Sequence, residues 1–129
     1  MEKVEPKTGS YVQLFVYRVP KKDHDAFALA QGGLADIFRK HGVVQSEFFQ
    51  LGTFRAFGGF LNVAQAISAS PEDEVWLELE RYEDAKSKDE VVASIGKDPA
   101  AGPLFRQVLS LTVQGAMPLQ GDFTRVKVG

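Results

Sequence analysis

Cysteine is absent from the 129 residues of the chain, and histidine occurs only twice. Without cysteine the chain has no disulfide, no thiolate nucleophile, no zinc–thiolate site and no iron–sulfur ligation. The two histidines, His24 and His41, are too few for a histidine-rich metal site. We therefore expect no metal site, and the absence of disulfides fits a reducing compartment.

Long apolar runs and clusters of basic residues are also missing. No apolar run approaches the ~18 residues that a membrane helix needs, and residues 1–7 lack the apolar core of a signal peptide. The net charge is −2 with a pI near 5.7, and the longest basic run is the pair Lys21 and Lys22. Such a chain lacks the basic patch that nucleic-acid-binding proteins carry. We expect a cytoplasmic protein that binds neither nucleic acid nor membranes.

Motifs for nucleotide cofactors and for a nucleophilic serine are missing as well. The chain contains no P-loop, no dinucleotide fingerprint and no G-x-S-x-G elbow, and we expect no cofactor. What remains is the composition of a globular domain, with 44% hydrophobic and 25% charged residues. We expect a flexible lead-in over residues 1–9 and a single domain over residues 10–129.

Hydrophobic periodicity predicts four strands and three helices. Apolar residues at spacings of three and four after Asp23 predict an amphipathic helix that Asp23 caps and Gly42 ends. Asp84 is placed to cap a second helix, and apolar–polar alternation marks the strands. Residues 52–73 are irregular, with a short strand or a helical turn in 61–68. The predicted elements are strands 11–19, 43–51, 74–82 and 123–128 and helices 23–41, 85–95 and 103–112.

This order of elements predicts an α+β fold of the ferredoxin-like βαββαβ type, an antiparallel four-stranded sheet with helices on one face. The other face is apolar and needs cover, so we expect a homodimer through the sheet face, a dimeric α/β barrel. We expect the helices to pack on the side of the sheet that carries Val75, Leu77 and Leu79. The open face would then carry the aromatic residues Tyr11, Phe15, Tyr17 and Trp76.

Several short motifs are spread across residues 10–128. They are residues 15–22, His41 with Gly42, Glu74 with Val75, Tyr82, Lys88 with Asp89, Asp98 with Pro99, and Met117 with Pro118 and Gly121. Together they resemble an uncharacterised bacterial family in the dimeric α/β-barrel superfamily. The resemblance implies the dimeric barrel fold and supplies no catalytic residue, although the superfamily includes cofactor-free oxygenases. The chain departs from the family pattern at residues 52–54, which replace a pair of acids, and at Leu79, which replaces a tryptophan.

Two ionisable residues that interrupt apolar stripes are candidates for catalysis. His41 extends the stripe of the first helix and is a candidate base; the alternative is a histidine favoured by the helix dipole beside Gly42. Glu78 shares a strand face with Trp76, and a carboxylate desolvated there has a raised pKa and can accept a proton. For Glu80 we favour pairing with a lysine or arginine across the dimer, or exposure to solvent.

A pocket for a small apolar or aromatic ligand is predicted between sheet and helices. Arg55 would orient an anionic ligand under a lid of phenylalanines, unless these side chains cover a core edge or a partner subunit. The protein would then be a binding module or a cofactor-independent enzyme of monooxygenase-like type; the alternative is a non-catalytic homodimer whose apolar face serves self-association alone. The candidate ligand-binding residues are Tyr17, Trp76, Phe54, Arg55, Phe57 and Phe60.

Overall fold

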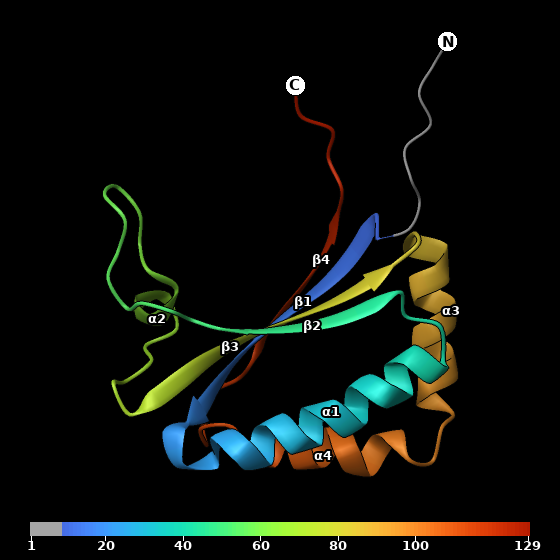
Figure 1. Ribbon diagram of the computed structural model, residues 1–129, viewed down its shortest axis with the longest axis horizontal. Helices are drawn as coiled ribbons and strands as arrows, with labels where there is room; N and C mark the ends of the chain where they lie inside the picture. Colours follow the sequence, from blue (N-terminus) through green and yellow to red (C-terminus); the bar gives the residue numbers. More distant parts are fainter. Residues whose placement is uncertain (1–8) are drawn as a thin grey trace.

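The computed structural model describes residues 9–129, so the lead-in predicted over residues 1–9 lies almost wholly outside the described part of the chain (Figure 1). Within residues 9–129, every helix is too short or too polar to cross a bilayer. The strands are β1 (Tyr11–Pro20), β2 (Gln45–Gln50), β3 (Asp73–Tyr82) and β4 (Leu119–Thr124). The helices are α1 (His24–Lys40), α2 (Val63–Ala66), α3 (Ala85–Gly96) and α4 (Ala101–Ser110), and a 3-10 turn, Lys21–Asp23, precedes α1.

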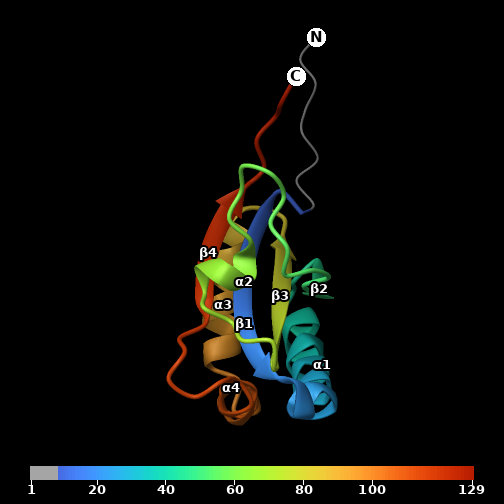
Figure 2. The same ribbon diagram turned by 90° about the vertical axis from the view of Figure 1, so that its left-hand side faces the viewer.

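The four strands form one antiparallel sheet in the order β2-β3-β1-β4. Helices α1, α3 and α4 cover one face of this sheet, and the segment that contains α2 rises on the opposite side (Figures 1 and 2). This arrangement confirms the predicted ferredoxin-like α+β fold. It leaves a helix-covered face and an open face with different side chains.

The assignment of side chains to the two faces was wrong. The register pairs Tyr17 with Trp76, and both rings contact Phe27 of α1, at centroid distances of 5.4 and 4.9 Å. The aromatic side chains therefore lie on the helix-covered face. Because side chains alternate along a strand, Leu77 and Leu79 lie on the open face. Both stripes of β1 read as apolar in the sequence, and the alternation along β3 favoured the wrong face because its buried stripe carries Glu78 and Glu80.

Local signals placed most element boundaries correctly. Asp84 accepts a hydrogen bond from the Ser87 amide at 2.8 Å and caps α3, and Gly42 ends α1 with a φ of +111° that favours glycine. Asp23 occupies the N-cap position of α1, but its side chain makes no capping hydrogen bond.

The structure resolves two segments for which the sequence signals were weak. The last strand runs over Leu119–Thr124, earlier than the predicted 123–128, because its pairing with β1 aligns Leu119 with Val16. Residues 61–68 contain the short helix α2, which Asn62 starts with a capping box.

Candidate functional site

Polar side chains are buried between α1 and the sheet, where a hydrophobic core would be expected. Glu78 on β3 accepts a hydrogen bond from the Tyr17 hydroxyl at 2.7 Å and one from the Gln31 amide of α1 at 3.4 Å. Glu78 and Gln31 are each 2% exposed. Burial, followed by the charge of Glu78, raises the pKa of Tyr17 well above its usual range. The tyrosine therefore stays a neutral hydrogen-bond donor.

Glu80, two residues further along β3, is buried completely. Its side chain is 0% exposed, and one carboxyl oxygen accepts a hydrogen bond from the Ser46 hydroxyl of β2. Desolvation, followed by the hydrogen bond and charge of Glu78, raises the pKa of Glu80 to about 10. The expectation that Glu80 meets solvent or a cation was wrong. At neutral pH it is a buried, protonated acid.

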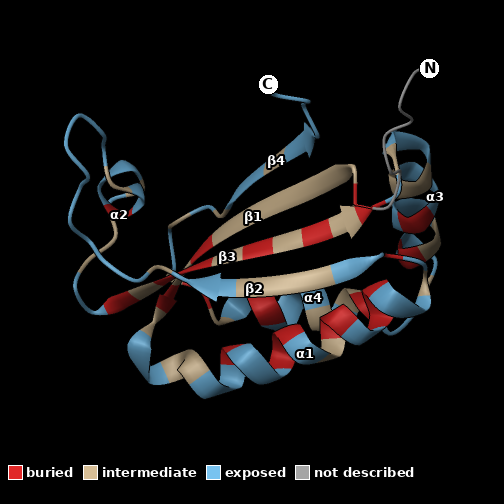
Figure 3. Cartoon of the chain, turned by 45° about the horizontal axis from the view of Figure 1, so that its top comes forward, coloured by how far each residue is buried: buried red, intermediate tan, exposed pale blue. Residues whose placement is uncertain are grey.

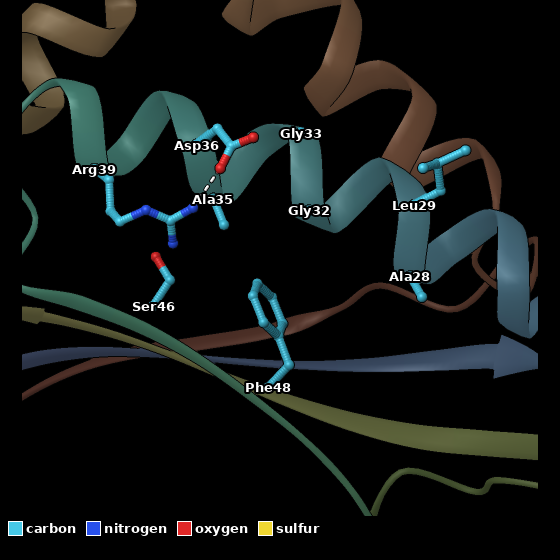
Figure 4. Close-up of a pocket in the computed structure, with 9 residues that line it drawn as sticks. All are labelled: Ala28, Leu29, Gly32, Gly33, Ala35, Asp36, Arg39, Ser46 and Phe48. Carbon is cyan, nitrogen blue, oxygen red and sulfur yellow. Dashed lines mark hydrogen bonds and ion pairs between the residues drawn. The ribbon is translucent and has the colours of Figure 1, made fainter.

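The polar cluster lies beside a cleft of about 600 Å³ between α1 and β2 (Figure 4). In this view Ser46 and Phe48 rise from β2 toward α1, and Arg39 lies above Ser46 and pairs with Asp36. Ser46 both lines the cleft and hydrogen-bonds Glu80. It therefore connects the cleft to the buried acid.

Small residues on α1 make room for this cleft. Ala28, Gly32 and Ala35 line it from one face of the helix. A Cβ placed on Gly32 would meet no atom within 4 Å, whereas one on Gly33 would touch Leu104 of α4 at 3.5 Å. The glycine pair therefore serves two purposes, an open cleft on one side and helix packing on the other.

His41 belongs to a different cluster. Its ring nitrogens lie 2.6 Å from the Ser94 hydroxyl of α3 and 2.7 Å from the Asp98 carboxylate. The hydrogen bond from His41 is the largest influence that lowers the pKa of Asp98. Both nitrogens are engaged in joining α1 to α3 and to the turn before α4, so the geometry separates His41 from the Glu78 cluster.

The predicted aromatic lid lies on the other side of the sheet. Residues 51, 52, 61 and 63 line a second, apolar hollow of about 610 Å³ together with Leu14, Val16 and Leu77 of the open face. Phe54, Phe57 and Phe60 of the same segment are exposed. The sheet separates Tyr17, Trp76 and Glu78 from Phe54, Arg55, Phe57 and Phe60, so one pocket cannot use both sets.

Sequence reasoning missed Ser46, Arg39 and the cluster around His24. The His24 imidazole and the Trp76 indole both contact one carboxyl oxygen of Glu74, at 2.7 and 2.9 Å. The hydrogen bond to Glu74 raises the pKa of His24. The available signal was the spacing His24, Ala28, Gly32, Ala35 and Arg39, which places all five on one side of a helix. Within residues 9–129, no group of three potential ligands is placed to hold a metal ion.

Solved structures with the same arrangement include two oxygenases. A monooxygenase from the gene ActVA-Orf6 of Streptomyces coelicolor, in complex with nanaomycin D, matches with a TM-score of 0.60 and 17% identity over 96% of this chain and 93% of that one. SnoaB, a cofactor-independent oxygenase from Streptomyces nogalater, matches with a TM-score of 0.54 and 12% identity over 92% and 96%.

A dimeric ferredoxin-like protein from an uncultured marine organism matches with a TM-score of 0.58 and 7% identity over 97% of this chain and 96% of that one. At such identities the likeness shows the shared fold alone. No curated protein matches the chain in sequence.

The comparison with family models covers the strands and helices that build the polar cluster and the cleft. It bears out the resemblance to an uncharacterised family noted in the sequence. Residues 10–109 match the model of DUF1428, a family described as a protein of unknown function, and the chain belongs to that family.

Proposed function

We propose that the protein binds a small, largely apolar or aromatic molecule in the cleft between α1 and β2. The observation that carries this proposal is the contact of Ser46 with both the cleft and the buried, protonated Glu80. A buried acid with a strongly raised pKa beside a cleft is typical of a functional site. The cleft volume, about 600 Å³, is in the range of small-molecule sites.

The shape of the cleft favours a flat ligand. The Phe48 ring faces the α1 side that carries Gly32 and Ala35 (Figure 4), which leaves a slot for a planar apolar body. Arg39 and Ser46 lie together at one end and offer hydrogen-bond donors to a polar or anionic group. A hydroxylated aromatic compound combines these two features.

A cofactor-independent enzyme of monooxygenase-like type is the catalytic form of this proposal. Protonated Glu80 would give its proton to the Ser46 oxygen as Ser46 gives its own proton to a ligand oxygen. Glu78, which accepts a hydrogen bond from Tyr17, would keep Glu80 protonated. The likeness to the two Streptomyces oxygenases supports this reaction class by fold analogy only. Of the predicted catalytic pair, Glu78 remains in the proposal, and we assign His41 to the joint between α1 and α3.

We further propose that two copies associate through the open face, in the cytoplasm. The centre of this face is apolar, with Leu14, Val16 and Leu77. Ion pairs lie on the same face toward its two ends, Arg18 with Asp73 and Arg81 with Glu47. An apolar centre with a polar rim is the usual anatomy of a protein interface.

The binding test uses 2-naphthol, a planar apolar molecule with one weakly acidic hydroxyl. NMR titration of the labelled protein should shift the amide signals of Gly32, Ser46 and Phe48. Gly32→Leu should fill the slot and abolish these shifts, whereas Ala93→Leu, which adds similar bulk at an exposed position of α3, should preserve them. Shifts confined to Leu14, Leu77 and their neighbours would contradict the assignment of the site to the cleft.

The enzymatic version is tested by oxygen consumption with 1,4-dihydroxynaphthalene as the reductant. The rate should exceed the protein-free rate and fall in Ser46→Ala and in Glu80→Gln. Naphthol binding with no acceleration of oxygen uptake would leave a binding module and exclude the oxygenase for this class of compound.

The non-catalytic homodimer remains the second candidate, and the apolar open face favours it. Its signature is a stable dimer in which neither naphthol nor dihydroxynaphthalene shifts any signal of the α1–β2 cleft.

A further inference from the structure

An exposed aromatic tip, residues 54–61, projects from the segment between β2 and β3. Phe57 and Phe60 are 81% and 70% exposed, and Leu61 is 69% exposed. The tip is coloured as exposed along its whole length and stands away from the body of the molecule (Figure 3). Large apolar side chains gathered on one projection are typical of an interaction site rather than of ordinary surface.

The tip is held in a defined conformation. The Asn62 side-chain amide donates hydrogen bonds to the carbonyls of Thr53 and Arg55, at 3.0 and 3.1 Å, and so closes the base of the tip. Inside it, the Phe60 amide bonds the Phe57 carbonyl at 2.9 Å, and the two rings lie 5.9 Å apart. A preorganised projection loses little conformational entropy when it binds.

The base of the tip is continuous with the open face of the sheet. Leu61 and Gly52 line the same apolar hollow as Leu14 and Leu77. Figure 1 shows the tip on the side of the sheet opposite α1 and α4. A molecule that covers the open face therefore meets the tip as well.

Surface area favours a second copy of this chain as that molecule. Five partly or largely exposed phenylalanines lie on the open face or on the tip: Phe49, Phe54, Phe57, Phe60 and Phe123. At 150–250 Å² for a whole aromatic side chain, together they expose on the order of 500 Å². That is more than half of the ~800 Å² that each partner buries in a standard interface.

Charge disfavours an anionic membrane as the occupant. Arg55 is the one cation among residues 54–61, and the chain carries a net charge of −2. Membrane-surface segments instead combine apolar side chains with several lysines or arginines.

We propose that the aromatic tip of each copy packs against a second copy of this chain and extends the interface made by the two open faces. Phe57 and Phe60 are its anchors. The inference rests on the homodimer proposed above. It adds a contact outside the sheet, between the tip of one copy and the other copy, which we call the clasp. The clasp contains most of the exposed aromatic surface.

The test compares Phe57→Ser/Phe60→Ser with Leu29→Ser, which removes an equally exposed side chain (79%) from the helix-covered side. In sedimentation velocity from 0.1 to 100 µM, the double variant should dissociate at a concentration at least tenfold higher than the wild type. Leu29→Ser should match the wild type. Because the substituted side chains are exposed, circular dichroism should show all three proteins folded.

The outcomes separate the two proposals. A wild-type chain that is monomeric throughout this range overturns both. A wild-type dimer whose dissociation constant is unchanged in the double variant overturns the clasp alone.

The absence of native cysteine permits a second measurement. A single cysteine at Ala56 in the tip should react with maleimide at least fivefold more slowly at 100 µM protein than at 0.1 µM, whereas one at Leu29 should react at the same rate at both. Equal protection of the two positions contradicts the clasp. Another outcome is that the protein binds vesicles of phosphatidylcholine and phosphatidylserine through the tip, while the cysteine at position 56 reacts with maleimide equally fast at both protein concentrations. The tip would then bind a membrane rather than a second copy, and the inference would be overturned.

Discussion

Each face of the sheet carries an exception to the usual division between an apolar interior and a polar surface. The helix-covered face buries two acids, Glu78 and Glu80, whereas the open face leaves Leu77, from the same strand, only partly covered. Buried acids are costly unless they are hydrogen-bonded or protonated, and a contiguous exposed apolar face is uncommon on a monomer. We infer that the buried acids serve the proposed site in the α1–β2 cleft, and that the open apolar face serves the proposed association of two copies.

The largest effect that tests this assignment of the two sheet faces is a loss of folding stability on substitution of Trp76. Trp76→Ala removes a ring that packs on Phe27 in the helix-covered core, and we expect a loss of about 3–5 kcal/mol in the free energy of unfolding. Urea unfolding measures it, with Phe123→Ala on the open face as the control that loses less. A Trp76→Ala protein that keeps its stability and loses only dimerisation would contradict the face assignment.

The next effect concerns the pH dependence set by Glu80. Folding raises the pKa of Glu80 from 4.5 to about 10, so the folded state holds a proton that the unfolded state releases. Stability should therefore decrease as pH rises between these values, with a slope of up to roughly 1–1.5 kcal/mol per pH unit. Glu80→Gln, which stays neutral, should flatten this slope in urea unfolding from pH 5 to 9. Identical slopes for both proteins would show that Glu80 ionises freely in the fold.

A charge at the centre of the open face should affect association more than folding. Leu77→Lys would place an ammonium group in the apolar centre of the proposed interface, where no acid is provided for it. We expect the variant to be a folded monomer at ~10 µM in sedimentation, where the wild type is a dimer. Leu29→Lys, on the exposed side of α1, is the control that should preserve the dimer.

The smallest expected effect is a gain in stability at the cleft. Gly32 lies within a helix and an added Cβ meets open space, so Gly32→Ala should raise the unfolding free energy by about 0.5–1 kcal/mol through helix propensity. Gly42→Ala is the contrasting variant, since a φ of +111° strains any side chain, and it should lose stability. Equal behaviour of the two would contradict the open slot at Gly32.

The sequence alone determined the order of elements, the fold class and most boundaries. These follow from local signals: the helical spacing of apolar residues, the acidic cap at Asp84 and the glycine stop at Gly42. The alternation along residues 74–82 also grouped Glu78 with Trp76 on one stripe, although it assigned that stripe to the open face. Each of these signals acts within a few residues of the chain, so it can be read without a partner.

Only the tertiary structure decided which face of the sheet the helices cover, and with it the site. Both stripes of β1 are largely apolar, and the alternation along β3 pointed to the wrong face because the buried stripe carries Glu78 and Glu80. The contacts of Phe27 with Tyr17 and Trp76 settle the choice. The link from the cleft through Ser46 to Glu80 joins β2 to β3 across 34 residues of sequence. Such a contact depends on strand register, a property of the packed sheet that no local segment encodes.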